Sequence, residues 1–149
     1  MNIVNTPIDY ADASICKMFT ANLTLNRTGC LVMGAGSALA AKEAWPELPR
    51  FFGDWLQNDD GGLLFHAHSN IGAVHTKDNW KNKSKLHIIS NSLDDLIDWM
   101  HRQKTVWGMK DLVVHMPYPG ISNGGLTREE VAPYLQELPP NVVIHDLES

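Results

Sequence analysis

The stretch from Leu31 to Ala44, LVMGAGSALAAKEA, constrains the fold more than any other part of this chain. An apolar run leads into two glycines separated by one alanine, and good helix formers follow. This order predicts a loop that feeds the start of a helix. We expect the helix to span residues 37–45, because Pro46 disfavours helical geometry at the residue before it. Such a helix start attracts phosphate; the alternative interpretation is an ordinary tight turn.

A second glycine-rich stretch runs from Pro117 to Leu126, PYPGISNGGL. Its three glycines and one asparagine tolerate left-handed backbone angles, so that successive N–H groups can converge on an anion. The alternative is a flexible surface connection. A helix over residues 127–138 should follow, with Thr127 as its N-cap and Pro139 and Pro140 beyond its end.

Short apolar segments alternate with helical patterns along the rest of the chain. This alternation predicts an α/β sandwich with helices on both faces of a mixed sheet. Ligands bind beyond the carboxyl ends of strands in such sheets, so both glycine-rich loops should lie at one edge. The longest helix should be capped by Ser84 or Asn82. We expect strands at residues 3–4, 18–25, 63–68, 71–75, 111–116 and 142–144 and helices at 37–45, 49–57, 85–103 and 127–138, whereas residues 7–17 stay undecided.

Chain length and net charge limit the number of domains and the classes of binding partner. With 149 residues the chain fits a single domain, residues 1–149, and its net charge of −5 argues against a broad electrostatic grip on nucleic acid or an anionic membrane. We find no signal peptide and no run long enough to cross a membrane, so we expect a cytoplasmic protein with Cys16 and Cys30 reduced. His66, His68 and His75 match no recognised zinc spacing, and we predict no metal site.

Both loops together resemble the macrodomain family. The resemblance rests on Val32–Leu39, Pro117–Gly120 and Gly124–Leu126, in this order and spacing, followed by Glu130-Val131. It implies a three-layer α/β/α sandwich that binds ADP-ribose without a cofactor, with the diphosphate and the distal ribose held between the two loops. The residues that it assigns to ligand binding are Asn26, Met33, Gly34, Ala35, Gly36, Ser37, Thr76, Tyr118, Pro119, Gly120, Ile121, Ser122, Asn123, Gly124, Gly125 and Leu126.

The segment Thr76-Lys77-Asp78-Asn79-Trp80 is similar to one branch of that family. The branch holds the DNA ADP-ribosyl glycohydrolase antitoxins and the glutamate-ADP-ribose hydrolases. In it, the lysine of the Thr-Lys pair faces the distal ribose and serves catalysis, which implies a catalytic Lys77. The alternative is a solvated surface lysine, as most lysines are.

The chain departs from the family pattern in its acidic and amide residues. The glutamate-directed relatives carry an aspartate where this chain has Gly124, which favours the DNA-directed branch. Asn26 is the nearest candidate for the asparagine at the distal ribose, although it lies about two residues upstream of the family position. Asp9 and Asp12 both compete for the contact with adenine. The resemblance does not choose between them.

The expected chemistry is cleavage at the anomeric carbon of the distal ribose, with Lys77 as nucleophile or proton donor. The expected partners are ADP-ribose or ADP-ribosylated DNA or protein, with no stable nucleic-acid scaffold and no membrane. Two alternatives are a non-catalytic reader of ADP-ribose or a related nucleotide, and a phosphatase of ADP-ribose 1″-phosphate. We expect Trp45 and Trp80 near the ligand. We also expect Gly36→Glu to abolish binding without unfolding the protein, because its carboxylate would repel the phosphates.

Overall fold

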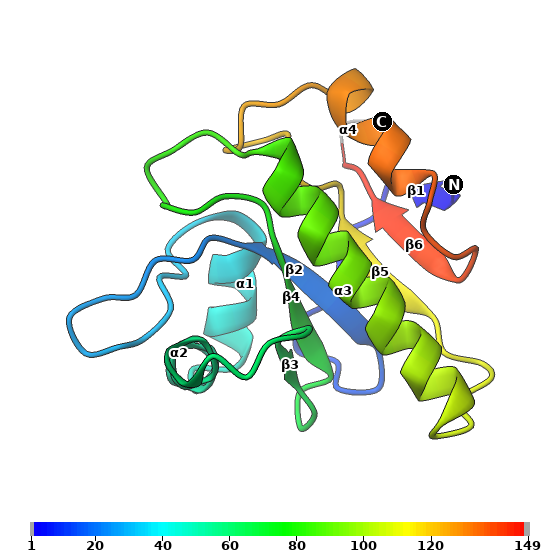
Figure 1. Ribbon diagram of the computed structural model, residues 1–149, viewed down its shortest axis with the longest axis horizontal. Coiled ribbons are helices and arrows are strands. Elements are labelled where there is room, and N and C mark those ends of the chain that lie inside the picture. The colour runs from blue at the N-terminus through cyan, green and yellow to red at the C-terminus, as the bar shows by residue number, and fades with distance from the viewer. Residues whose placement is uncertain (1, 148–149) are drawn as a thin grey trace.

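Six strands form one sheet in the order β1-β6-β5-β2-β4-β3 in the computed structural model, which describes residues 2–147 (Figure 1). All neighbouring strands run parallel except β3, which is antiparallel to β4. The sheet is therefore mixed, as expected. The strands are β1 (Asn2–Val4), β2 (Cys16–Ala21), β3 (Phe65–His66), β4 (Ile71–His75), β5 (Val114–Pro117) and β6 (Val142–His145).

Helices cover both faces of this sheet, which confirms the three-layer sandwich. The pair α3 (Leu86–Thr105) and α4 (Arg128–Leu135) lies on one face, and α1 (Gly36–Ala44) and α2 (Leu48–Asn58) lie on the other (Figure 1). Neighbouring strand residues point to opposite faces, so that Ala73 packs in the core beneath α1 and α2 while Val74 packs beneath α3.

The long helix α3 follows the predicted pattern closely. Its side chains at spacings of three and four, Ile89, Leu93, Leu96 and Met100, are buried against the sheet. The start of α4 is also as predicted, because the Thr127 hydroxyl accepts from the Glu130 N–H and the Glu130 carboxylate accepts from the Thr127 N–H.

Element boundaries differ from the predictions where side chains turn the chain. The strand predicted for residues 18–25 ends at Ala21, because the side-chain amide oxygen of Asn22 accepts from the Thr24 N–H and bends the chain. The prediction of a cap at Ser84 or Asn82 was wrong: the N-cap of α3 is Lys85, with no side-chain hydrogen bond. The strand predicted for residues 111–116 begins only at Val114. The strand predicted for residues 63–68 is reduced to Phe65–His66. The helix predicted for residues 127–138 ends at Leu135.

A buried lysine joins two connections at the amino end of the sheet. Lys17 has no exposed surface, and its ammonium group donates to the carbonyls of Asp12 at 2.7 Å, Ile15 at 3.0 Å and Ser69 at 2.9 Å. Burial lowers its pKa, and the nearby charge of Asp12 opposes this effect. The ammonium group thereby ties the β1–β2 connection to the turn between β3 and β4.

Two histidines form a hydrogen-bonded chain across β5, β6 and the end of β1. The Nδ1 of His145 lies 2.7 Å from the Thr6 carbonyl and donates to it. The His145 Nε2 lies 2.8 Å from the His115 Nδ1, and the two ring nitrogens share a hydrogen bond. Burial lowers the pKa of His115, with a smaller contribution from His145.

We expect the free energy of unfolding to fall as the pH is lowered from 7 to 5. Burial lowers the pKa of His66, His75 and His115 in the folded protein, so the unfolded chain binds protons first as the pH drops through about 6.5. Stability is therefore highest above that pH and is lost below it. Urea titrations at several pH values measure the slope. The variant His101→Gln replaces an exposed histidine and should show the same dependence of the free energy of unfolding on pH. A free energy of unfolding that does not change between pH 7 and 5 would contradict the prediction.

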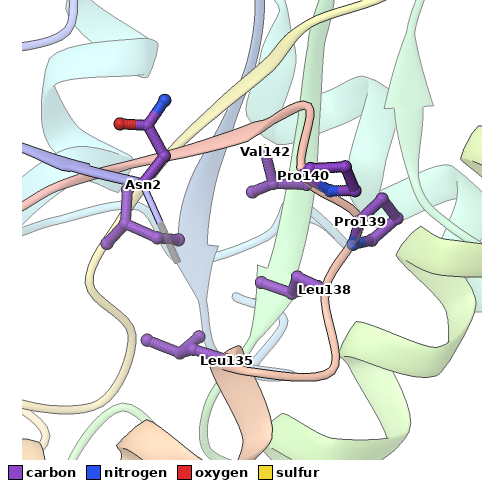
Figure 2. A pocket seen from close by; sticks show the side chains of 7 residues that line it. Asn2, Leu135, Leu138, Pro139, Pro140 and Val142 are labelled. Atoms are coloured by element: carbon purple, nitrogen blue, oxygen red, sulfur yellow. The ribbon is translucent and has the colours of Figure 1, made fainter.

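The end of α4 leaves only a small hollow against β1 and β6. It measures about 30 Å³, and Leu135, Leu138 and Pro139 face Asn2 and Val142 across it (Figure 2). That is roughly the space of one water molecule, so this hollow is a packing gap rather than a ligand site.

Candidate functional site

Three connections meet at the carboxyl edge of the neighbouring strands β5, β2 and β4. We name residues 32–37 the first loop, residues 117–126 the second loop and residues 76–85 the lysine loop. The lysine loop and the second loop lie on the same side of the sheet in Figure 1. This edge is where open α/β sheets bind ligands.

The first loop presents free backbone donors at the start of α1. The N–H groups of Gly34, Ala35, Gly36 and Ser37 donate to none of the other described residues. The Ser37 hydroxyl accepts from the Thr20 N–H at 2.9 Å and so fixes the helix start to β2. These N–H groups can therefore bind an anion from a fixed position.

Glycine is required at Gly36 for its backbone, but not at Gly34. Gly36 has φ +58°, a left-handed conformation that strains any side chain. A Cβ at Gly34 would meet nothing within 4 Å, and its φ lies outside that region. A loss of affinity in Gly36→Glu would therefore combine the effects of backbone strain and of the new charge, whereas a loss in Gly34→Glu would come from the new side chain without backbone strain.

The second loop is folded back on itself and also presents free donors. The Leu126 N–H donates to the Gly120 carbonyl at 2.9 Å, and Gly120 and Gly125 have φ of +81° and +73°. The N–H groups of residues 120–124 donate to no described residue. The two loops approach each other, because a Cβ at Gly36 would lie 3.8 Å from the Asn123 side-chain nitrogen.

Packing beneath the second loop explains why position 124 is a glycine. A Cβ there would collide with the Ser84 hydroxyl and with the Gly120 carbonyl group. The Ser84 N–H also donates to the Gly124 carbonyl at 2.8 Å, which joins the lysine loop to the second loop. An aspartate, as the glutamate-directed relatives would carry there, does not fit this loop conformation.

Asp78 organises the lysine loop. Its carboxylate accepts from the Lys85 ammonium group at 2.8 Å and from the Asn82 side chain at 3.2 Å, and these bonds hold its pKa well below its usual range. The Asp78 carbonyl accepts from the Leu23 N–H at 3.0 Å, which fixes this loop to the chain that leaves β2.

Lys77 precedes Asp78 and directly follows Thr76. The Thr76 N–H donates to the Ala21 carbonyl, and its carbonyl accepts from the Lys85 N–H, so Thr76 continues the β2–β4 ladder beyond His75. Lys77 is half-buried and makes no hydrogen bond or ion pair with any other residue in the range 2–147. Its ammonium group is therefore available to a ligand.

Several predicted site residues have structural partners of their own. The side-chain amide oxygen of Asn26 accepts from the Thr28 and Cys30 N–H groups in an exposed turn, and Arg50 and Gln57 of α2 donate to the Thr28 and Gly29 carbonyls of that turn. Tyr118 is buried, and its hydroxyl donates to the Arg128 carbonyl. Met33 is buried in the core beneath α1, and Pro119, Ile121 and Leu126 are at least partly buried beneath the second loop.

The expectation that Trp45 lies near the ligand was wrong. Trp45 follows α1 at its far end, donates to the Tyr10 carbonyl at 2.7 Å and packs edge-on against His68 in the turn before β4. One helix length separates it from the first loop. Asp12 also lies at this opposite edge, because its carbonyl accepts from Lys17 near the start of β2. Asp9 lies at the same end, because its carbonyl accepts from the Asp12 N–H at 3.3 Å and its charge also acts on Lys17.

Sequence patterns did not identify two residues that support the loops at this edge. Buried Asn22 donates from its amide to the Val32 carbonyl at 3.2 Å and supports the first loop from below. Ser84 is buried under the second loop, and its hydroxyl has no partner among the described residues. In the sequence, Asn22 follows a strand and Ser84 precedes a helix. Many residues without a role at a site have such positions, so these positions alone do not identify them.

The described residues hold no group of three histidine, cysteine, aspartate or glutamate side chains placed to bind a metal. His66 instead bonds to the Ser69 hydroxyl at 2.7 Å, and the His75 Nδ1 lies 3.0 Å from the Asn22 carbonyl. Across residues 2–147, no helix combines the length and the apolar character that a bilayer crossing requires.

The fold matches solved DarG macrodomains over nearly the full chain at low sequence identity. The macrodomain of Mycobacterium tuberculosis DarG is 26% identical with a TM-score of 0.70, and 96% of each chain is covered. The macrodomain of Thermus aquaticus DarG is 21% identical with a TM-score of 0.73, and 97% of each chain is covered. The mixed sheet with its flanking helices is therefore a macrodomain-like α/β fold.

A third structure, Thermosipho africanus DarTG in complex with ADP-ribose, is 24% identical with a TM-score of 0.68. The alignment covers 99% of this chain and 42% of that longer chain. No protein-family model and no curated protein matches this sequence.

Proposed function

We propose that this chain forms one macrodomain that binds ADP-ribose across the first and second loops and hydrolyses an ADP-ribosyl bond. The observation that carries the proposal is the pair of facing loops, in which the backbone N–H groups of residues 34–37 and 120–124 have no acceptor among the described residues. A diphosphate supplies acceptors for such donors, and the start of α1 adds a favourable field. The match to DarG macrodomains, and the ADP-ribose in the Thermosipho africanus DarTG structure, support the same ligand.

The distal ribose would then lie toward the lysine loop. Thr76 continues strand β4 at the edge where the loops meet, and Lys77 follows it directly. Cleavage breaks the bond between the anomeric carbon and the leaving group, water adds to that carbon, and the leaving group takes a proton. Lys77 supplies the proton as an ammonium group. Alternatively, it attacks the carbon as a neutral amine; the proton from Nζ then passes to the leaving group, and water cleaves the carbon–nitrogen bond to release ADP-ribose and the lysine.

The lysine loop favours a nucleobase over a carboxylate-linked substrate. Trp80 is 51% exposed, and the Lys81 ammonium group lies 5.4 Å from its ring centre. An exposed indole flanked by cations can stack on a base and pair with its phosphates. The space at Gly124 excludes the aspartate that the glutamate-directed relatives use.

A non-catalytic reader is the second candidate, and one observation favours it. The second loop contains no carboxylate, so no acidic side chain in it can assist Lys77. Binding through backbone N–H groups would not require such a group.

Incubation with three substrates separates these functions. ADP-ribosylated DNA, ADP-ribosylated protein and ADP-ribose 1″-phosphate are supplied separately, and release of ADP-ribose or phosphate is measured. We expect release from the DNA substrate. Release from none of them, together with tight ADP-ribose binding, would identify a reader.

We expect ADP-ribose to bind with micromolar affinity, on the order of −8 kcal/mol, and Gly34→Glu to weaken it at least about tenfold. The new carboxylate would stand in open space next to the phosphates and repel them. Titration calorimetry gives both affinities. The variant Gly34→Gln has the same size without the charge and should lose less affinity, while thermal unfolding should be alike in all three proteins. Equal binding by the Glu and Gln variants would rule out the first loop as the phosphate site.

A further inference from the structure

A large groove lies at the opposite end of α3 from the lysine loop. It is formed by the C-terminal half of α3 and the connection between α2 and β3, and it measures about 650 Å³. That volume is within the range of ligand sites and far above the hollow beneath α4. Since α3 begins at Leu86 and the groove begins at Asp95, about 14 Å of helix separates the groove from the end of the lysine loop.

Three indole rings line the groove. Trp99 packs against Phe65 with 4.6 Å between ring centres, and Trp55 donates to the Gly61 carbonyl at 3.2 Å, so both rings are held in place. Trp107 follows the end of α3 and is 71% exposed. A water-exposed tryptophan beside two anchored ones is unusual for a surface without a partner.

The charge of the groove is negative. Asp60, Asp95 and Asp98 line it against a single cation, Arg102, which pairs with Asp98 at 3.2 Å. Burial raises the pKa of Asp95, and the charges of Asp94 and Asp98 raise it further. A cation in the groove would relieve this repulsion, whereas a nucleotide, a sugar phosphate or an anionic membrane would increase it.

The geometry points to a docking site for an arginine- or lysine-bearing segment of a partner protein. A guanidinium or ammonium group can stack on an indole face while it pairs with a neighbouring carboxylate, and its aliphatic stem covers the remaining apolar wall. The combination of three tryptophans with three aspartates fits this chemistry. The site does not depend on the proposed ADP-ribose function, because it shares no residue with the three loops.

Titration with a capped hexa-arginine peptide, followed by tryptophan fluorescence and calorimetry, tests the assignment. The complete chain should bind this peptide and not capped hexa-glutamate. Trp107→Ala and the double variant Asp95→Asn/Asp98→Asn should each raise the Kd by about tenfold or more. Trp107 is exposed, so its replacement should not unfold the protein, and circular dichroism verifies this.

Matched controls separate this groove from general attraction to an acidic protein. Glu43→Gln removes an exposed charge on α1, on the other face of the sheet, and Trp80→Ala removes the exposed indole in the lysine loop; both variants should bind the peptide as the parent does. Equal weakening in all variants, or no binding at millimolar peptide, would overturn the proposal. Concentration-dependent self-association that Trp107→Ala abolishes would also overturn it and would assign the groove to a second copy of this chain.

Discussion

Replacing Lys77 with alanine is expected to slow the release of ADP-ribose at least about a hundredfold, the usual scale for a positioned proton-transfer group. The affinity for ADP-ribose should change much less, because the backbone N–H groups of the first and second loops are untouched by the substitution. Single-turnover release from the best of the three substrates and calorimetry with ADP-ribose measure the two quantities separately.

Lys81 is the matched control for Lys77. It belongs to the same loop, is exposed and lies over Trp80. Lys81→Ala should leave the chemical step intact, although substrate affinity can fall. If turnover and ADP-ribose affinity fall together in Lys77→Ala, this lysine is only a binding contact. Unchanged turnover would remove the catalytic assignment and favour the reader.

Replacing Lys17 with methionine is expected to destabilise the fold by about 3 kcal/mol or more. Methionine fills a similar volume, but the carbonyls of Asp12, Ile15 and Ser69 would each lose the bond from the ammonium group, and Asp12 would keep only the Ile15 N–H at 3.3 Å. A buried acceptor left without a partner costs about 1–3 kcal/mol. The gain from no longer burying a charge offsets part of this cost, and we expect the lost hydrogen bonds to dominate because there are three of them.

Urea unfolding of Lys17→Met against the parent measures the change. The exposed-site variant Lys42→Met is the control and should stay within about 0.5 kcal/mol of the parent. Equal stability of parent and Lys17→Met would mean that water or local rearrangement satisfies the three carbonyls.

Local patterns in the sequence predicted most of the architecture. The spacing of Ile89, Leu93, Leu96 and Met100 marked α3, and Thr127 with Glu130 marked the start of α4, because both signals act within a few residues. The placement of both glycine-rich loops at one edge followed from the alternation of strands and helices. The macrodomain-like fold then followed from the resemblance of these loops to a known family.

The features that could not be predicted from the sequence depend on contacts between residues far apart in the chain. Trp45 was expected at the ligand because it lies near the first loop in the sequence, but α1 carries it to the opposite edge. The packing of Ser84 beneath Gly124 joins residues 40 positions apart, and no local pattern encodes it. The catalytic role of Lys77 depends on a substrate, so it stays a prediction.

The tight packing at Gly124 also limits how this loop can evolve. A single codon change to aspartate would force the new side chain into Ser84 and into the Gly120 carbonyl at once. A compensating change at Ser84 would free only half of that space, since the other half is occupied by main chain. The two-step path therefore crosses intermediates with a disrupted loop, and the effects of the two substitutions would not add. An aspartate at position 124 would therefore first need a different backbone in this loop.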